Sequence, residues 1–415
     1  MSNLVKLSSI ATLPVGFVGT MAKHYAESGV PLLRSLNIKP FKIVGNDMKY
    51  VSEEFSNSIS KSILHEGDVI IVRTGIPGTC CVVPAEYDGC NCSDVVIVHP
   101  NTALVEPHYL AAFINVWGQR QVQNNKVGAI QQHFNVHSAE EMLIFLPDLD
   151  EQKRIASVIV ALNSKIDNNN VICNELETMA KTIYDYWFTQ FDFPDANGKP
   201  YRTSGGAMEW NEEFKCNIPY GWSTVRLSDI CTFRNGINYE KGCRGNRTYR
   251  IVNVRNITAS NYLMDVSDFD EISLLREQAD RYVLGEHDII IARSGTPGAT
   301  RLIMNPEDNV IFCGFIICCT PNASEYRLFI SQYLKKLEGT NATKTGGSIL
   351  QNVSQDTLKS LLVCLPNKAT VEAFNAQIMP LVTKMDNVIR ENRELTELRD
   401  WLLPMLMNGQ ATVAE

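Results

Sequence analysis

The sequence predicts an α+β protein in which a mixed α/β domain occurs twice and two long helices pack as an antiparallel coiled coil. Three observations support this prediction: a helical seam in mid-chain, a second seam near the C-terminus, and a sequence repeat that joins each seam to a globular segment. We expect globular domains at residues 1–147 and 218–366, long helices at 148–187 and 367–410, and a linker at 188–217.

The central helix is predicted from apolar residues that advance by alternating steps of four and three. Asp148 and Asp150 offer N-cap oxygens at its start. So narrow a seam is typical of a helix that packs lengthwise on one long partner. The seam consists of Ile155, Ile159, Leu162, Ile166, Asn169, Cys173, Leu176, Ala180, Ile183 and Trp187.

The partner helix is predicted near the C-terminus, where Met385-Asp386-Asn387 repeats Ile166-Asp167-Asn168. Pro380 should end or kink this helix locally, so that its regular part begins at Leu381, and Pro404 should end or kink it again. Asn169 and Asn392 lie within the two seams, where a polar residue can fix the register of a coiled coil. The second seam consists of Leu381, Met385, Val388, Asn392, Leu395, Arg399 and Leu402.

The repeat extends into the globular segments. EGDVIIVRTGIPG at 66–78 matches EHDIIIARSGTPG at 286–298, and GAIQQ at 128–132 matches GSILQ at 347–351. Two copies of this size imply approximate two-fold symmetry, which suits a two-fold target. Apolar runs bounded by Gly and Pro, and helical periodicity, predict strands at Asp68–Arg73, Thr79–Val83 and Val95–His99, and helices at Pro107–Gln123 and Ser324–Leu337.

Composition limits the class of protein. The chain has 415 residues, of which 45% are hydrophobic, and this is enough for two or three domains with real cores. It has no apolar run long enough to span a membrane and no secretory leader, so we expect a cytoplasmic protein. Its 12 cysteines have irregular spacing and are best explained as small buried residues. The net charge is −8, but the acidic excess lies mainly in the helices, linker and tail, which leaves room for a basic face.

These motifs together resemble the specificity subunit of type I restriction–modification systems. The resemblance covers nearly the whole chain and is carried by RTGIPG and RSGTPG, LPDLDEQKRI, ETMAKTIYDYWFTQFDFP, and NIPYGW before VRLSDI. It implies that 1–147 and 218–366 are target-recognition domains, each reading one half of a split site in double-stranded DNA. It also implies that the helices act as a spacer, and that the subunit recruits two methyltransferase subunits and, in the full complex, two restriction subunits.

The same resemblance implies that this chain performs no catalysis and holds no cofactor, since S-adenosylmethionine is expected on the methyltransferase partner. The helix length agrees with a spacer, because about 37 helical residues span roughly 55 Å, or about 16 base pairs of B-DNA. The second helix departs from the family pattern at Pro380 and at its start, LPNKATVEAF, which lacks the EQ-type opening.

Candidate DNA contacts are concentrated in the stretch 233–257, where basic residues alternate with Asn and Tyr. Arginine can donate two hydrogen bonds to guanine or phosphate, and asparagine can pair with adenine; the alternative is a solvated charged loop. Arg73 and Arg293 precede the repeated glycine turn, where each could reach a phosphate or pair with an acid. Gln131 could read a base or cap a loop. The candidates are Lys23, His24, Arg34, Asn37, Arg73, Gln131, Arg234, Lys241, Arg244, Arg247, Arg250, Arg255 and Arg293.

Other functional classes find less support. The chain has no phosphate-binding GxxxxGK[ST] loop, no N/D-P-P-Y/F motif for base amination and no glycine-rich S-adenosylmethionine loop. Cys80, Cys81, Cys90, Cys92 and His99 fit the spacing of structural zinc poorly, so no metal is expected. A protein-only adaptor and a self-sufficient methyltransferase or nuclease remain as alternatives. Salt-sensitive affinity for DNA in the assembled complex would argue against the adaptor.

Overall fold

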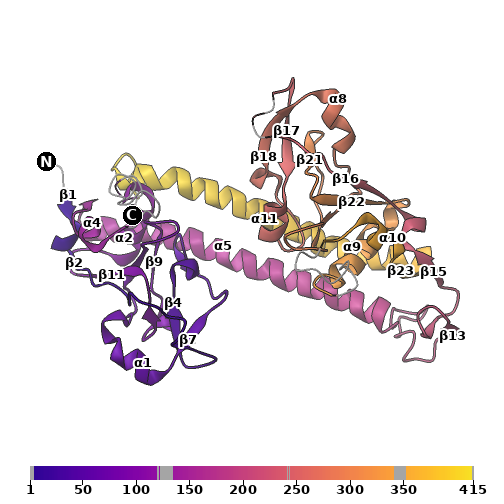
Figure 1. Ribbon diagram of the computed structural model, residues 1–415, viewed down its shortest axis with the longest axis horizontal. Helices are drawn as coiled ribbons and strands as arrows, with labels where there is room; N and C mark the ends of the chain where they lie inside the picture. The colour runs from indigo at the N-terminus through magenta and orange to yellow at the C-terminus, as the bar shows by residue number, and fades with distance from the viewer. Residues whose placement is uncertain are drawn as a thin grey trace. The chain divides into compact units, whose positions relative to one another are not determined.

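The computed structural model describes residues 4–118, 121, 134–240, 242, 244–340 and 352–413 (Figure 1). The chain divides into two compact units, and the division falls within both long helices. The first unit is Met1–Asp167 with Arg393–Glu415, and the second is Asn168–Asn392. Each unit therefore contains one of the two globular segments and part of both helices.

The first unit is built on two four-stranded sheets. One has the order β2-β11-β8-β9 with antiparallel neighbours, and the other has the order β10-β4-β7-β3, in which β10 and β4 are parallel. The strands predicted at 68–73, 79–83 and 95–99 correspond to β8, β9 and β11. The strands are β1 (Leu4–Lys6), β2 (Ala11–Thr12), β3 (Tyr25–Ala26), β4 (Val30–Leu33), β5 (Ile38–Lys39), β6 (Lys42–Ile43), β7 (Lys49–Val51), β8 (Val69–Val72), β9 (Cys80–Val82), β10 (Asn91–Cys92), β11 (Val95–Pro100) and β12 (Leu143–Phe145).

The helices of the first unit are short apart from the long helix. The helix predicted from Pro107 begins there as α2, continues as a π-helical turn, and is helical again at Gln121; residues 119–120 and 122–133 lie outside the described part. The segments are η1 (Leu7–Ser9), η2 (Ser35–Asn37), α1 (Glu53–Ser58), η3 (Ser60–Ser62), η4 (Ala85–Tyr87), α2 (Pro107–Phe113), η5 (Ile114–Gly118) and α4 (Val136–Glu140).

The second unit repeats the main sheet as β16-β22-β19-β20. A three-stranded sheet, β18-β17-β21, again has one parallel pair, β17 with β21. Its strands are β13 (Met208–Asn211), β14 (Cys216–Pro219), β15 (Ser223–Arg226), β16 (Cys231–Asn235), β17 (Arg247–Val252), β18 (Asp270–Leu274), β19 (Ile289–Ala292), β20 (Thr300–Arg301), β21 (Val310–Phe312), β22 (Ile316–Pro321) and β23 (Leu362–Leu365).

The helices of the second unit include the one predicted at 324–337, which the structure divides into a 3₁₀ turn and α9. The segments are η6 (Asp185–Thr189), α6 (Leu227–Ile230), α7 (Val254–Ala259), η7 (Val266–Asp268), α8 (Arg276–Ala279), η8 (Asp280–Tyr282), η9 (Ser324–Tyr326), α9 (Arg327–Lys336) and α10 (Gln355–Ser360).

The central strand of each main sheet is apolar throughout because both of its faces are buried. In β8, Val69 and Ile71 belong to one hydrophobic cluster while Ile70 and Val72 belong to another. In β19, Ile289 and Ile291 divide in the same way from Ile290 and Ala292. A continuous β-branched run is what a strand buried on both faces requires.

The two long helices are α5 (Leu149–Tyr184) and α11 (Lys368–Met407). In the first unit, Arg399 Nη1 donates to Asn163 Oδ1 at 2.9 Å. In the second unit, Asn169 Nδ2 donates to Asn392 Oδ1 at 2.9 Å. In the same unit, Cys173 Sγ donates to Met385 O at 3.9 Å. Partners on α11 therefore fall in number as those on α5 rise, so the helices are antiparallel in the second unit, as expected.

The expectation for the prolines was wrong, because α11 runs through both Pro380 and Pro404. A proline inside a helix removes one backbone hydrogen bond and crowds the carbonyl four residues before it. Pro380 and Ala376 are exposed, so water can reach that side of the helix, while Phe374, Ile378 and Val382 on the opposite side are fully buried. Packing of the buried side maintains the helix where the local sequence would break it.

The linker predicted at 188–217 is more ordered than its composition indicates. Strands β13 and β14 pair as an antiparallel hairpin. Phe188, Phe191 and Phe193 are buried and make ring contacts with Trp222. The start of the segment therefore belongs to the second unit's core, and its end forms a hairpin, so the segment is not a free connector.

Candidate nucleic-acid interface

The glycine turn after β8 and β19 has the same geometry in both units. Gly75, Gly78, Gly295 and Gly298 all have positive φ, between 77° and 91°. Gly78 N–H donates to Val72 O at 3.0 Å, and Gly298 N–H donates to Ala292 O at 2.9 Å. These glycines meet the backbone requirement of a tight turn. In the first unit the turn borders an open cavity of about 550 Å³, which is also lined by Arg34, Leu36, Lys39 and Asp94.

The arginine before each turn has different partners in the two units. The side chain of Arg73 is 17% exposed, its Nη1 lies 3.5 Å from Asp94 Oδ1, and its Nε donates to Phe134 O at 3.3 Å. Arg293 donates from Nη1 to the backbone oxygen of Gly314 at 3.3 Å. Of the two alternatives considered for Arg73, the structure shows the acid pair.

Asn37 does not fit the prediction that it contacts DNA. Its side chain is fully buried, with Oδ1 accepting from Arg34 N–H and Nδ2 donating to the backbone oxygens of Val44 and Asn46. Both amide hydrogens are used, so none remains for a base. Its repeat counterpart Asn256 caps α7 in the same way.

The other candidates of the first unit are at its surface. Lys23 is exposed, and the exposed His24 ring stacks on Phe55 with 3.9 Å between ring centroids. Arg34 pairs with Asp47 at 2.9 Å. Hydrogen bonds from Lys49 and Arg34 lower the pKa of Asp47. The charge of Arg34 is thus partly neutralised, while Lys23 offers an accessible cation.

Arg234 is also a structural residue rather than a free DNA contact. Its guanidinium donates to the backbone oxygens of Arg281 and Val283 at 3.0 and 2.9 Å and binds the buried carboxylate of Asp288. The repeat explains this role, because Asp288 corresponds to Asp68, which pairs with His99 at 2.6 Å in the first unit. An unpartnered buried carboxylate would be costly, so each unit supplies a cation.

The remaining arginines of the basic stretch divide into paired and unpaired groups. Arg247 pairs with Asp308 at 3.0 Å, and Arg255 pairs with Asp270. Arg244 is exposed and Arg250 is half-buried, and among the described residues the structure shows no ion pair for either. Lys241 and Gln131 lie outside the described residues. The unpaired candidates are therefore Lys23, Arg244, Arg250 and Arg293.

Two exposed apolar side chains lie beside the turns and were not among the candidates predicted from the sequence. Ile76 is at the tip of the first turn and is 70% exposed, and Phe315 precedes β22 and is 62% exposed. Apolar side chains at such positions can contact a thymine methyl group or stack on a base. One signal for Phe315 was available. The first copy has no residue that corresponds to it, because Asp94 is followed directly by Val95, the counterpart of Ile316.

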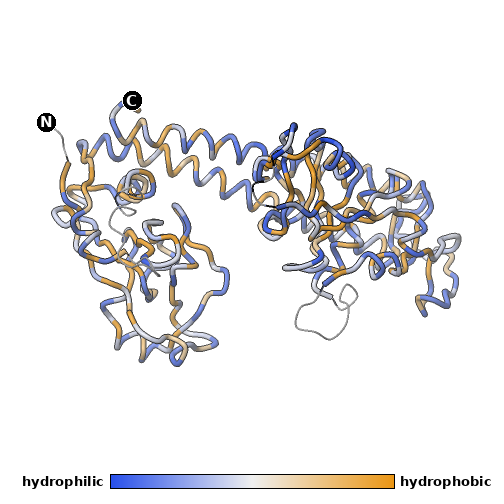
Figure 2. Tube along the Cα trace, turned by 45° about the horizontal axis from the view of Figure 1, so that its top comes forward, coloured by the Kyte–Doolittle hydropathy of each residue, from blue (hydrophilic) through white to orange (hydrophobic). Residues whose placement is uncertain are grey.

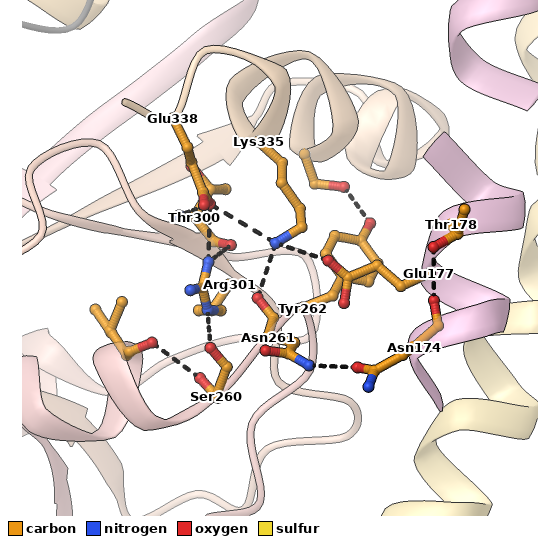
Figure 3. A network of polar contacts seen from close by, with 12 residues as sticks. Asn174, Glu177, Thr178, Ser260, Asn261, Tyr262, Thr300, Arg301, Lys335 and Glu338 are labelled. Atoms are coloured by element: carbon orange, nitrogen blue, oxygen red, sulfur yellow. Dashed lines mark hydrogen bonds and ion pairs between the residues drawn. The ribbon is translucent and has the colours of Figure 1, made fainter. Parts of the chain in front are cut away.

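A polar network joins the second globular segment to α5 (Figure 3). Lys335 of α9 reaches Glu177 of α5 at 3.0 Å and the backbone oxygen of Asn261 at 2.9 Å. Asn261 Nδ2 also donates to Asn174 Oδ1 of α5 at 2.7 Å. These contacts fix the orientation of the globular segment on the helix, as a spacer that carries a reading domain requires.

Within the described part of the chain, no group of three His, Cys, Asp or Glu side chains could hold a metal ion. Burial raises the pKa of the thiols of Cys318 and Cys364 to about 12, which makes them inert apolar residues. Among the described helices, none is both long and apolar enough to cross a membrane. Hydrophobic and hydrophilic residues alternate along both long helices (Figure 2).

Comparison with known proteins identifies the family. Residues 30–178 and 219–399 match the model of the type I restriction modification DNA specificity domain. The specificity subunit of the type I restriction enzyme HindI from Haemophilus influenzae is 21% identical over 414 residues, which cover 85% of this chain and 88% of that protein. The MjaIX specificity subunit from Methanocaldococcus jannaschii is 24% identical over 280 residues, or 66% of this chain and 62% of that protein.

A solved structure supports the fold. The type I restriction–modification S subunit from M. genitalium superposes with a TM-score of 0.56 at 14% identity, covering 97% of this chain and 95% of that one. At this identity the likeness shows the fold alone, and the two matched sequence segments carry the family assignment. The chain therefore belongs to the family of type I restriction–modification DNA specificity proteins.

Proposed function

We propose that this chain is the sequence-reading and assembly subunit of a cytoplasmic type I methylation and restriction complex. Each globular segment reads one half of a split DNA site, and α5 with α11 sets the spacing between the halves. The observation that carries this proposal is the repeat in space of one main sheet and one glycine turn, each attached to the same pair of helices. Two similar readers on one spacer suit two half-sites on one duplex.

The chain acts by binding rather than by chemistry in this proposal. Two methyltransferase subunits, which hold S-adenosylmethionine, dock on the helices, and two restriction subunits join in the full complex. The exposed residues on α5 and α11 outside the paired seam, among them Val171, Met179, Leu398 and Trp401, provide apolar surface for docking.

The test is a genome-wide map of methylated bases, by single-molecule sequencing, with and without this gene. We expect one split motif to lose methylation on deletion. Replacing residues 1–147 should then change one half-site only, and replacing residues 218–366 should change the other. A swap that altered both halves, or a map that did not change although the methyltransferase co-purifies, would contradict the proposal.

A protein-only adaptor is the second candidate, and the observation that favours it is the pairing of arginines with acids. Arg34, Arg73, Arg234, Arg247 and Arg255 all have acidic partners, which lowers the charge available for phosphates. The two functions differ in salt dependence. DNA binding through phosphates weakens steeply as salt rises, while an adaptor would show no such DNA affinity.

A further inference from the structure

The inference concerns the one arginine that the repeat places identically in both units. Arg73 and Arg293 follow β8 and β19, and their backbone oxygens accept hydrogen bonds from Phe134 and Val353 respectively, at 3.1 and 2.9 Å. The two carbonyl groups therefore have equivalent partners, and the comparison turns to the groups around each guanidinium.

The residue opposite the arginine differs between the copies, and backbone hydrogen bonds establish the correspondence. Asp94 N–H donates to Phe17 O at 3.1 Å, and Gly314 N–H donates to Ile237 O at 2.8 Å. Phe17 and Ile237 are themselves equivalent, since their N–H groups donate to Cys92 O and Phe312 O at 3.0 and 2.9 Å. Gly314 therefore stands where the first unit has Asp94.

This replacement removes the carboxylate from the second copy. Asp94 lies 3.5 Å from Arg73 and accepts a hydrogen bond from Thr74 Oγ1, so that it holds the arginine and the turn together. In the second unit the corresponding contact is a single hydrogen bond from Arg293 to Gly314 O at 3.3 Å. Among the described residues, the structure shows no acid paired with Arg293.

The second copy also gains an exposed aromatic ring next to this arginine. Phe315, the residue after Gly314, is 62% exposed, and its backbone oxygen accepts from Arg293 N–H at 2.9 Å. The guanidinium of Arg293 is anchored through one nitrogen and has further donors left over, and the residue that its backbone contacts has an exposed ring. These two features together are suited to DNA.

We propose that Arg293 contacts the DNA strand beside Phe315, whereas Arg73, neutralised by Asp94, braces its own turn. The inference rests on the proposed function, and it assigns different roles to two residues that the sequence repeat treats as one. The acceptor is a phosphate oxygen or the guanine edge, both of which an arginine can bind through two donors.

The experiment measures binding of the full chain, assembled with its methyltransferase subunits, to a duplex that carries the split site. We expect Arg293→Ala to weaken binding about tenfold or more. We expect its matched control Arg73→Ala to change affinity less than about twofold while lowering the melting temperature, because its contacts are internal. Equal losses for the two variants, or no loss for Arg293→Ala, would overturn the inference.

A gain-of-contact variant keeps the inference testable even if Arg73→Ala folds poorly. Asp94 has φ of 56°, a conformation that asparagine tolerates well, so Asp94→Asn removes the charge without straining the backbone. It should free Arg73 and tighten binding, and adding Arg73→Ala to Asp94→Asn should abolish the gain. If the double variant kept the gain in affinity, the gain would come from removing the repulsion between Asp94 and DNA. That result would contradict the inference that Asp94 holds Arg73 away from DNA. The reverse change, Gly314→Asp, is less suitable because its Cβ would lie 2.0 Å from Asn238 Oδ1.

The same measurements identify the acceptor. If Arg293 binds a phosphate, Arg293→Ala weakens specific and non-specific duplexes alike and reduces the salt slope by about one, and Arg293→Lys retains most of the affinity. If it binds guanine, the loss is confined to the specific duplex and Arg293→Lys does not rescue it. A wild-type complex with no salt-dependent affinity for any duplex would instead overturn the proposed function, and this inference with it.

Discussion

Asn37 shows how a repeated residue can be prominent in sequence and yet have an internal role. The Asn-Ile pair at 37–38 recurs at 256–257, and the sequence offered no means of telling a base-reading amide from a buried cap. The structure identifies caps, because the side chain of Asn37 bonds to three backbone groups and that of Asn256 bonds to two. Repetition indicates that a residue is needed in both copies, but not whether protein or DNA is its partner.

We therefore predict that Asn37→Ala destabilises the first unit by about 1–3 kcal/mol, because buried backbone groups lose their partners. Chemical unfolding measures this loss. The exposed neighbour Asn46 is the control, and Asn46→Ala should stay within about 0.5 kcal/mol of wild type. Affinity for the specific duplex should not change in either folded variant. Weaker binding by folded Asn37→Ala than by Asn46→Ala would show that Asn37 contacts DNA after all.

The basic stretch 233–257 was identified from its charge, but charge alone could not distinguish arginines that are free to contact DNA from arginines that form structural ion pairs. Arg234, Arg247 and Arg255 are held by acids that lie 15 to 61 residues away in sequence, a distance at which pairing cannot be read from a single chain. For Arg244 and Arg250 the described part of the structure shows no ion pair, and their contact with DNA stays a prediction. A count of arginines therefore overestimates the charge available to DNA.

At the scale of the element, a polar layer joins the seams of the two long helices, and its role in fixing the register stays a prediction. Asn169 is 1% exposed, and its Nδ2 reaches both Glu391 and Asn392, at 2.8 and 2.9 Å. The seam periodicity predicted where the polar residues would fall. It could not predict continuity through Pro380, since that depends on burial of the opposite side.

We predict that Asn169→Leu destabilises the helix pair by about 1–3 kcal/mol, because the side chains of Asn392 and Glu391 lose the hydrogen bonds that they accept from the buried Asn169 amide. Asn169→Leu with Asn392→Leu should recover part of that loss by replacing the polar pair with an apolar one. Unfolding of both single variants and the double variant gives the coupling energy. Losses that simply add would show that the two asparagines do not act together.

The end of α5 should make stability depend on pH. Partial burial opposes the charge of Asp185, but hydrogen bonds from Lys181 and Lys336 outweigh it and lower the pKa of this carboxyl. A lowered pKa in the folded state contributes stability that is present above the unfolded value of about 3.9 and is lost as pH falls through the folded value.

We therefore predict that Asp185→Asn has a lower melting temperature than wild type at pH 7, and that the gap narrows as the pH falls from about 5 to below about 3. Melting curves recorded across this range measure the effect. Glu240→Gln, at an exposed position, is the control and should follow wild type throughout. A gap that is constant with pH would mean that Asp185 acts by packing and not by charge.

At the scale of the whole molecule, the internal repeat predicted the architecture because it is a property of the entire chain. The repeat predicts two globular segments, each followed by a long helix, without reference to any single strand or turn. What it could not give was the division into compact units, in which each unit takes part of both helices. That division depends on which segment packs against which stretch of helix, as Lys335 and Glu177 show.

Since α5 and α11 each run without a break from one unit into the other, their length should set the separation of the half-sites. We predict that deleting seven residues from α5 between Ile155 and Tyr184, together with the facing seven from α11, leaves both half-sites unchanged. Seven residues amount to about 10 Å of helix, or about three base pairs, and a heptad keeps the seam in phase to about 20°. A methylation map of cells that carry the variant would reveal the new spacer.

Deletion from α5 alone is the control, because it leaves the antiparallel seams out of register and should destabilise the protein. If the paired deletion changed a half-site while the fold persisted, the helices would be shaping the readers and not only spacing them.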